Sequence, residues 1–526
     1  MPLAGIEHDK VPLGVVPLVV NACLSHTIII TQCNRGRHAS TIIMAHDDSN
    51  PPPTQGDPTA LPPLPLPAGI TSRFVDTRPF GLRYHVLEAI PAASSSSSAS
   101  ESEPAPRPPL VLLLHGFPNL AYDWRFVMPG LARAGYYAVA FDLRGFGRTH
   151  DGGGAVSGAS GSSGSSGAAA AQQQQKQQLL PRDGSFSADG FTPLAMVRDV
   201  VALVHALGYR SVHTLVGHDL GAFAAAVCAL ARRDLIQSLV LMAHPFRGAP
   251  KAPFGTAASA SLPAPDNPPT DRFDTLRDPD VHASLQALDP PRQHYKWYNG
   301  APGAAAEWSY PRDGPPLREF LRGYFHLKSG ACRDGGGGKP RPLGAWTAER
   351  LAVMPHYYIM RAGVSMRENV ALDMAAEREA AGAATTNDEE GKDRDRDKDK
   401  AKNWPPAPEW LTERDLDVYT AEWSRTTFTD ALRWYASLTG NPAATAELRA
   451  LASGRIAVPT RYVSGAKDWG TYQDPGALEA MEEGESVERG CYTGTVLLEG
   501  AGHWVNMERP GECVREILHV AAMVVV

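Results

Sequence analysis

Short apolar runs alternate along much of the chain with stretches whose apolar residues recur at helical spacing. Such runs are typical of strands buried on both faces of a parallel sheet, and the stretches between them are typical of covering helices. We expect strands within 73–90, 110–115, 136–143, 212–216, 236–242, 460–464 and 495–499, and helices at 193–207, 220–232 and 508–524. The pattern predicts an α/β fold with a mostly parallel central sheet and helices on both faces.

This alternation stops between residues 250 and 453. The segment is rich in aromatic residues and contains helical stretches such as 411–437. A helical excursion that leaves a sheet and returns to complete it lies over the carboxyl ends of the strands, where it can cover a ligand site. We therefore expect an N-terminal segment at 1–72, a core in two parts at 73–249 and 454–526, and a mainly helical lid at 250–453.

Low-complexity stretches interrupt both the core and the lid. They hold much of the excess of glycine and proline, at 49 and 45 residues, and they lack the apolar periodicity that would offset their ordering entropy. We expect residues 1–72 to be disordered or a leader, and the inserted stretches to be disordered loops. These stretches are 92–109 and 152–178 in the core, and insertions near 333–339 and 377–403 in the lid.

Charge and cysteine content narrow the class of function. A net charge of −7 argues against a nucleic-acid binder and fits a small neutral substrate. The six scattered cysteines form no C-x-x-C pair, so we expect a reducing compartment, the cytoplasm, and neither a metal nor a cofactor. Residues 11–30 are apolar but broken by prolines and polar residues, so membrane association is not expected. Residues 1–43, which precede Met44, leave organelle targeting open.

The stretch Gly217-His218-Asp219-Leu220-Gly221 joins a predicted strand to a predicted helix. Two glycines around one reactive residue at such a turn are typical of a nucleophile elbow, here with Asp219 in the usual serine position. A carboxylate that attacks an sp³ carbon forms an alkyl ester that water can cleave. Asp219 therefore predicts epoxide opening or carbon–halogen displacement, and the alternative is an aspartate that only caps the helix.

A histidine and a second carboxylate follow two later strands. His503 comes just after the strand at 495–499 and is the candidate base that hydrolyses the ester. Asp468 follows the strand at 460–464 and can orient the imidazole, with Asp474 as its rival. We prefer Asp468 because it lies nearer the strand end, where the sheet fixes its position.

The stretch His115-Gly-Phe-Pro118 ends the strand at 110–114. A loop amide at this place can join the amide that follows the nucleophile to bind an oxyanion. The predicted donors are the backbone N–H groups of Phe117 and Leu220.

Together these motifs resemble the epoxide hydrolase branch of the α/β-hydrolase superfamily, in which haloalkane dehalogenases are close relatives. The residues that carry the resemblance are His115–Pro118, Asp142–Gly147, Gly217–Gly221, Asp468 and Gly502-His503. It covers about 73–250 and 460 to the end, with fragments of the lid. It implies the α/β-hydrolase fold with an inserted lid.

The resemblance also implies two lid tyrosines that protonate the oxygen of the opening epoxide. Tyr295, with Tyr298 as the alternative, and Tyr435 lie in segments similar to those of the family. Such acids suit a strongly basic alkoxide, whereas a halide needs only N–H donors. Leu220 stands where dehalogenase relatives have a tryptophan, which counts against halide chemistry.

The sequence thus predicts an epoxide hydrolase that converts a small apolar epoxide and water to a vicinal diol through an ester on Asp219. Two alternatives remain, a haloalkane or haloacid dehalogenase-like hydrolase and a non-catalytic ligand receptor with the same fold. A receptor has little reason to keep the nucleophile, base, acid and tyrosines together. The identity of the epoxide and the oligomeric state are not predicted.

Overall fold

The protein's structure is a computed structural model, and part of the chain lies outside what it describes. The candidate leader at 1–43 lies outside the described residues, as do nearly all of 92–109, all of 152–178 and most of the expected lid insertions. The described residues are 58–79, 81–92, 107–151, 186, 190–250, 279–309, 315–333, 338–385 and 408–524.

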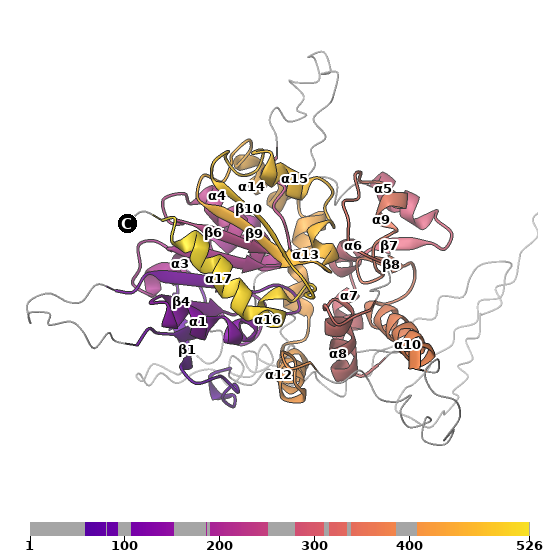
Figure 1. Ribbon diagram of the computed structural model, residues 1–526, viewed down its shortest axis with the longest axis horizontal. Helices are drawn as coiled ribbons and strands as arrows, with labels where there is room; N and C mark the ends of the chain where they lie inside the picture. The colour runs from indigo at the N-terminus through magenta and orange to yellow at the C-terminus, as the bar shows by residue number, and fades with distance from the viewer. Residues whose placement is uncertain are drawn as a thin grey trace, which may run out of the picture. The chain divides into compact units, whose positions relative to one another are not determined.

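An eight-stranded sheet forms the core of the described residues (Figure 1). Its strand order is β1-β2-β4-β3-β5-β6-β9-β10; β2 pairs antiparallel with β1 and β4, and the remaining pairs are parallel. The strands are β1 (Ile70–Asp76), β2 (Arg83–Ala89), β3 (Leu110–Leu114), β4 (Tyr137–Phe141), β5 (Thr214–His218), β6 (Leu239–Met242), β9 (Thr460–Gly465) and β10 (Tyr492–Leu498). The predicted mostly parallel α/β architecture is confirmed.

Helices cover both faces of this sheet. They are α1 (Met128–Arg133) and α17 (Pro510–Ala521) on one face, and α3 (Pro193–Ala206) and α4 (Leu220–Ala231) on the other. Val111 and Leu113 of β3 pack in the apolar cluster that includes residues of α1 and α17, whereas Leu112 and Leu114 pack in the cluster of α3 and α4. Because both faces are buried, the strands appear in the sequence as continuous apolar runs.

The chain between β6 and β9 forms the lid. Its elements are α5 (Pro279–Gln286), β7 (Arg292–His294), α6 (Tyr295–Gly300), α7 (Ala304–Ser309), α8 (Leu317–Leu327), α9 (Ala348–Leu351), β8 (Ile359–Arg361), α10 (Met366–Thr385), α12 (Glu413–Thr426), α13 (Thr429–Gly440) and α14 (Pro442–Ala450). In Figure 1, α13 lies between the sheet and α6. The Ser453 N–H donates to the Pro250 C=O at 2.9 Å, so the inserted segment leaves and rejoins the core at one place.

Several boundaries differ from those expected from the sequence. Strand β1 begins at Ile70, and Leu64 and Leu66 pack against the core, so the end of the expected disordered N-terminal segment is part of the fold. The helical stretch expected at 411–437 is two helices, α12 and α13, which are separated at Thr427, where φ is +56°. A positive φ at a β-branched residue cannot continue a helix.

Two expected insertions and the last helix also differ. Helix α10 runs to Thr385, through the start of the insertion expected at 377–403. Arg107, at the end of the stretch 92–109, donates from Nη1 to the Gly208 C=O at 3.0 Å and so belongs to the core. Pro510 starts α17 as a new helix after α16 (Val505–Glu508), because proline has no N–H to continue a helix but fits its first turn.

Four shorter elements complete the described chain. They are η1 (Pro58–Ala60), η2 (Ala121–Phe126), η6 (Trp469–Thr471) and α15 (Ala477–Glu482). Among the helices of the described residues, none has the length and apolar character needed to cross a membrane.

Candidate active site

Asp219 stands at the turn between β5 and α4, at the carboxyl edge of the sheet. Its φ of 53° and ψ of −117° lie outside the regions that non-glycine residues ordinarily adopt. The flanking glycines allow the turn, since a Cβ on Gly217 would collide with the Gly221 carbonyl and a Cβ on Gly221 would collide with the Leu114 carbonyl. The backbone thus holds Asp219 in a strained conformation, as expected of a nucleophile elbow.

The two carboxylate oxygens of Asp219 face different groups. The Phe117 N–H donates to Oδ1 at 3.0 Å, and Oδ2 lies 3.4 Å from His503 Nε2. The residue is 5% exposed. Burial raises the pKa of Asp219, but the hydrogen bond and charge of His503 and the charge of Lys328 hold that pKa well below its usual value. Asp219 is therefore an anion with one oxygen bound by the backbone.

His503 is bound from its other side by Asp468. Nδ1 lies 3.1 and 3.2 Å from the two Asp468 oxygens, so Nδ1 carries the proton and Nε2 faces Asp219. The Ser464 hydroxyl and the Gly470 N–H donate to Asp468 at 2.9 and 2.6 Å. Burial and Lys328 lower the pKa of His503, but Asp468 and Asp219 raise it more, so that the net pKa lies above its usual value.

The rival carboxylate, Asp474, lies in a different environment. Arg247 Nε donates to its two oxygens at 2.9 and 3.0 Å. The structure therefore brings Asp468, and not Asp474, to His503.

The loop that carries Phe117 is fixed by His115. The His115 Nδ1–H donates to the Gly116 C=O at 2.8 Å, and Nε2 accepts the Leu143 N–H at 3.0 Å. A Cβ on Gly116 would collide with Asp219, so glycine is needed for the loop to approach the carboxylate. Leu220, the other predicted donor, is the first residue of α4, where an N–H has no acceptor within its helix.

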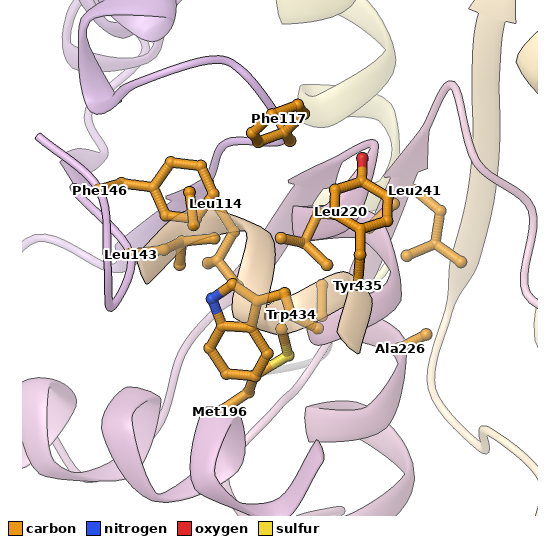
Figure 2. Close-up of a cluster of buried hydrophobic side chains, with 14 of the residues drawn as sticks. Leu114, Phe117, Leu143, Phe146, Met196, Leu220, Ala226, Leu241, Trp434 and Tyr435 are labelled. Atoms are coloured by element: carbon orange, nitrogen blue, oxygen red, sulfur yellow. The ribbon is translucent and has the colours of Figure 1, made fainter. Parts of the chain in front are cut away.

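Tyr295 and Tyr435 come together from opposite ends of the lid. Tyr295 begins α6 and Tyr435 lies on α13, and their ring centroids are 6.0 Å apart at 71°. Both line the cavity that reaches Asp219. Figure 2 shows the Tyr435 hydroxyl on the side of Phe117, whereas the neighbouring Trp434 points the other way. The two predicted tyrosines therefore share one wall of the site.

The alternative tyrosine, Tyr298, is directed elsewhere. Its hydroxyl donates to Glu307 and accepts the Met366 N–H at 3.2 Å. The Tyr295 hydroxyl instead donates to Gln473 Oε1 at 2.8 Å. Burial and the charge of Asp219 raise the pKa of Tyr295 well above its usual value. Burial likewise raises that of Tyr435, so both phenols keep their protons at neutral pH.

The cavity beside Asp219 has a volume of about 100 Å³. Its apolar lining includes Leu220, Phe223, Phe246, Trp434, Leu438 and Leu448. Its polar lining, besides Asp219 and the tyrosines, includes His244, Arg247, Lys296 and Asp474. The walls fit a largely apolar molecule whose reactive carbon approaches Asp219.

Lys328 belongs to this site and was missed by sequence reasoning. Its ammonium lies 4.8 Å from the ring centroid of Tyr358 and 5.2 Å from those of Tyr324 and Trp504. Burial lowers its pKa to about 8, although Asp219 and Asp468 act in the opposite direction. In the sequence it resembles an ordinary basic residue at the end of a helix, so no pattern marks it.

Glu508 was missed as well. Its carboxylate accepts the Gly330 N–H of the lid at 2.7 Å and the Gly502 N–H of the core at 3.0 Å, so it connects the lid to the loop that carries His503. Burial raises its pKa to about 7, although these backbone hydrogen bonds lower it. A glutamate just after His503 gives no signal for this bridge, because Gly330 is remote in the sequence.

The side chains that could hold a metal ion lie outside the Asp219 site. Within that site, His503 pairs with the carboxylates of Asp219 and Asp468. The described side chains that could together hold an ion are His326, Cys332 and Glu377, in the lid.

Known proteins are similar to this chain in sequence and in fold. The family described as "alpha/beta hydrolase fold" matches residues 109–277. The chain is 26% identical over 450 residues to "Epoxide hydrolase A" of Mycobacterium tuberculosis (strain ATCC 25618 / H37Rv), which covers 85% of this chain and 96% of the relative. It is 27% identical over 411 residues to "Epoxide hydrolase B" of the same strain, with coverage of 78% and 90%.

A solved structure is also similar to this chain over most of its length. The protein titled "Epoxide hydrolase from an endophytic Streptomyces" superimposes with a TM-score of 0.54 and 27% identity, over 87% of this chain and 96% of that one. These comparisons support the resemblance of the chain to the epoxide hydrolase branch of the α/β-hydrolase superfamily.

Proposed function

We propose that this protein hydrolyses epoxides to vicinal diols through a covalent ester on Asp219. One observation carries the proposal: Asp219 has one oxygen on the Phe117 N–H and the other 3.4 Å from His503 Nε2, in a cavity that Tyr295 and Tyr435 also line. The names of the relatives support the same reaction.

The first step is ring opening. Asp219 Oδ2 attacks an epoxide carbon, the carbon–oxygen bond of the ring breaks, and the ring oxygen takes a proton from Tyr435 or Tyr295. The products are a hydroxyalkyl ester and a tyrosinate. The alkoxide that would otherwise form is far more basic than a phenol with a pKa of about 10, so the proton transfer is downhill.

The second step is hydrolysis of the ester. His503 Nε2 takes a proton from water, whose oxygen attacks Cγ of Asp219, and the Phe117 N–H stabilises the negative charge on Oδ1. Collapse expels the diol oxygen, which takes the proton from His503. Asp219 returns its own proton to the tyrosinate, so that the net reaction is epoxide plus water to diol.

The charges of the site favour this order of events. In the resting site Asp219 raises the pKa of His503. Once Asp219 is esterified its negative charge is lost, and the pKa of His503 falls, since Lys328 and burial still lower it. The histidine thus becomes a better match for general-base catalysis when the ester forms.

Two alternatives are less well supported. A dehalogenase needs N–H donors for a halide, but the indoles of Trp308, Trp423, Trp434 and Trp504 donate to protein oxygens at 2.7–3.0 Å. A receptor that only binds a ligand would not need the His503–Asp468 pair to face Asp219.

The test is to trap the ester. An epoxide that the wild-type protein hydrolyses is mixed with His503→Gln protein, and intact mass and peptide mass are measured. We expect one epoxide mass added at Asp219, persistence of the adduct, and loss of steady-state turnover. Replacement of the exposed His205 by Gln is the matched control and should turn over normally. A His503→Gln protein that carries no adduct, or forms diol at the wild-type rate, would refute the covalent route.

A further inference from the structure

Three metal-ligand side chains meet in the lid, apart from the Asp219 site. His326 lies in the last turn of α8, Cys332 in the loop that follows, and Glu377 on α10. A ring nitrogen, the sulfur and a carboxylate oxygen all lie within 4.8 Å of one another. Cys332 is 4% exposed, and the side chains of His326 and Glu377 are 12% and 13% exposed. Helix α8, the loop after it and helix α10 thus place a nitrogen, a sulfur and an oxygen ligand atom together at one mostly buried position.

The histidine has an unsatisfied atom at the centre of this cluster. His326 Nε2 is buried without a hydrogen-bond partner, and it lies 3.6 Å from Glu377 Oε1, which is longer than a hydrogen bond. A buried polar atom without a partner destabilises the folded state. An ion bound to Nε2 would satisfy this nitrogen, and it would be a second partner for the Glu377 carboxylate, whose Oε1 already accepts the Arg333 N–H at 2.9 Å.

The ligand set selects the kind of ion. We infer that His326, Cys332 and Glu377 bind one zinc ion, with water in the fourth position of a tetrahedron. Ligand atoms about 2.0–2.3 Å from zinc lie roughly 3.3–3.8 Å from one another, so the cluster needs only a small contraction to reach that geometry. Nitrogen and sulfur ligands disfavour calcium and magnesium, which prefer oxygen.

The charges balance as well. Binding releases the thiol proton of Cys332 to solvent, so a thiolate, a carboxylate and a neutral imidazole surround the ion with two negative charges. These two charges neutralise Zn²⁺ in a mostly buried place, where an uncompensated charge would be costly. No electron transfer is involved, because zinc has no redox chemistry here.

The position of the cluster gives the ion a structural role. The loop between His326 and Cys332 carries Lys328, whose C=O accepts the His503 N–H at 2.7 Å. The same loop carries Gly330, which donates to Glu508. Zinc would tie this loop to α10 and so stabilise the part of the lid that contacts the histidine loop. The inference does not depend on the proposed epoxide chemistry.

The test uses the full-length protein, stripped of metal with a chelator and then titrated with ZnCl₂. We expect one zinc equivalent to bind by calorimetry and to raise the melting temperature. Cobalt(II) in place of zinc should give a thiolate-to-cobalt absorption band and the visible bands of a tetrahedral site. The variants Cys332→Ser, His326→Gln and Glu377→Gln should each weaken binding at least tenfold and reduce the thermal shift.

Matched controls separate this site from adventitious binding. Cys491→Ser and His205→Gln replace the same residue types away from the cluster and should bind zinc as the wild type does. If a variant fails to fold, protection of Cys332 from alkylation by zinc in the wild-type protein is measured by peptide mass instead. Zinc binding that is unchanged in folded Cys332→Ser protein, or equal alkylation of Cys332 with and without zinc, would overturn the inference.

Discussion

The core and the lid contribute to one site by different physical means. Asp219 follows β5 directly, and Asp468 and His503 come a few residues after β9 and β10. Their backbones are set by the sheet edge and by short local contacts. Tyr295 and Tyr435 come from helices distant in the chain, and only the packing of α6 against α13 brings them together.

This difference separates the roles that the two regions can play. The core holds the groups that we propose to form and cleave the ester, and their hydrogen bonds to backbone and side chains leave little freedom. The lid holds the proposed acids and the Lys328 charge, and its position depends on aromatic packing around Phe117, whose ring centroid lies 5.0 Å from that of Trp308 and 5.3 Å from that of Tyr435. We therefore expect substitutions of these core residues to abolish the reaction, and single substitutions in the lid to lower its rate only in part.

The largest effect is expected from Asp219→Ala. No ester can form without the carboxylate, so diol formation should fall by at least about 10⁴-fold, measured as kcat/KM. Alanine is preferred to asparagine, since slow deamidation of asparagine would restore the nucleophile. Freshly purified Asp219→Ala protein that turns over normally would show that the core does not supply the nucleophile.

The next effect tests the lid acids. Tyr435→Phe and Tyr295→Phe should each lower the rate of ring opening by about 10–100-fold, and the double variant should lose nearly all opening, because both hydroxyls serve one oxygen. Tyr298→Phe is the matched control, since its hydroxyl binds Glu307, and it should keep near wild-type activity. A double variant with near wild-type rates would reject both assignments.

A smaller effect is expected from Lys328→Met, measured on the pH dependence of ester hydrolysis in single turnovers. Hydrolysis needs neutral His503, so its rate falls as the pH drops below the pKa of that histidine. Lys328 lowers the pKa of His503, and its removal should move this fall to higher pH.

Lys296→Met provides the control for that measurement. Lys296 also lines the cavity, but it is not among the groups with the largest effects on the pKa of His503, whereas Lys328 is. The pH at which hydrolysis falls should therefore stay as in the wild type. Equal shifts in both variants would mean that the effect is not specific to the charge of Lys328.

The smallest effect concerns Glu508, which connects the two regions. Its pKa is raised to about 7 in the folded protein, so the folded state favours the protonated carboxyl. The associated stability is present at low pH and is lost as the pH rises through about 7. We expect the melting temperature of Glu508→Gln to change less between pH 5 and 8 than that of the wild type.

Glu499→Gln is the comparison for Glu508, because Glu499 is exposed near the same loop. Its melting temperature should follow the wild-type pH dependence. An unchanged pH dependence in Glu508→Gln would show that the bridge between Gly330 and Gly502 does not titrate in this range.

The architecture and the core part of the site could be predicted because their signals are local. A buried strand has to be apolar along its length, and a turn that brings Asp219 above the sheet needs glycine at 217 and 221 whatever the rest of the chain does. The order of strands and turns then brought Asp468 and His503 to the same edge.

The remaining choices depend on contacts between distant parts of the chain. Tyr295 and Tyr298 lie within one turn of a helix, and only the packing of α6 decides which of them lines the cavity beside Asp219. Asp474 pairs with Arg247 rather than with His503. Lys328 and Glu508 belong to the site through contacts with residues that sequence spacing does not reveal. Side-chain direction and burial in the lid depend on packing between distant segments, which the sequence alone does not reveal. The elbow at Asp219 depends on backbone sterics within a few residues, and for this reason the sequence alone was enough to predict it.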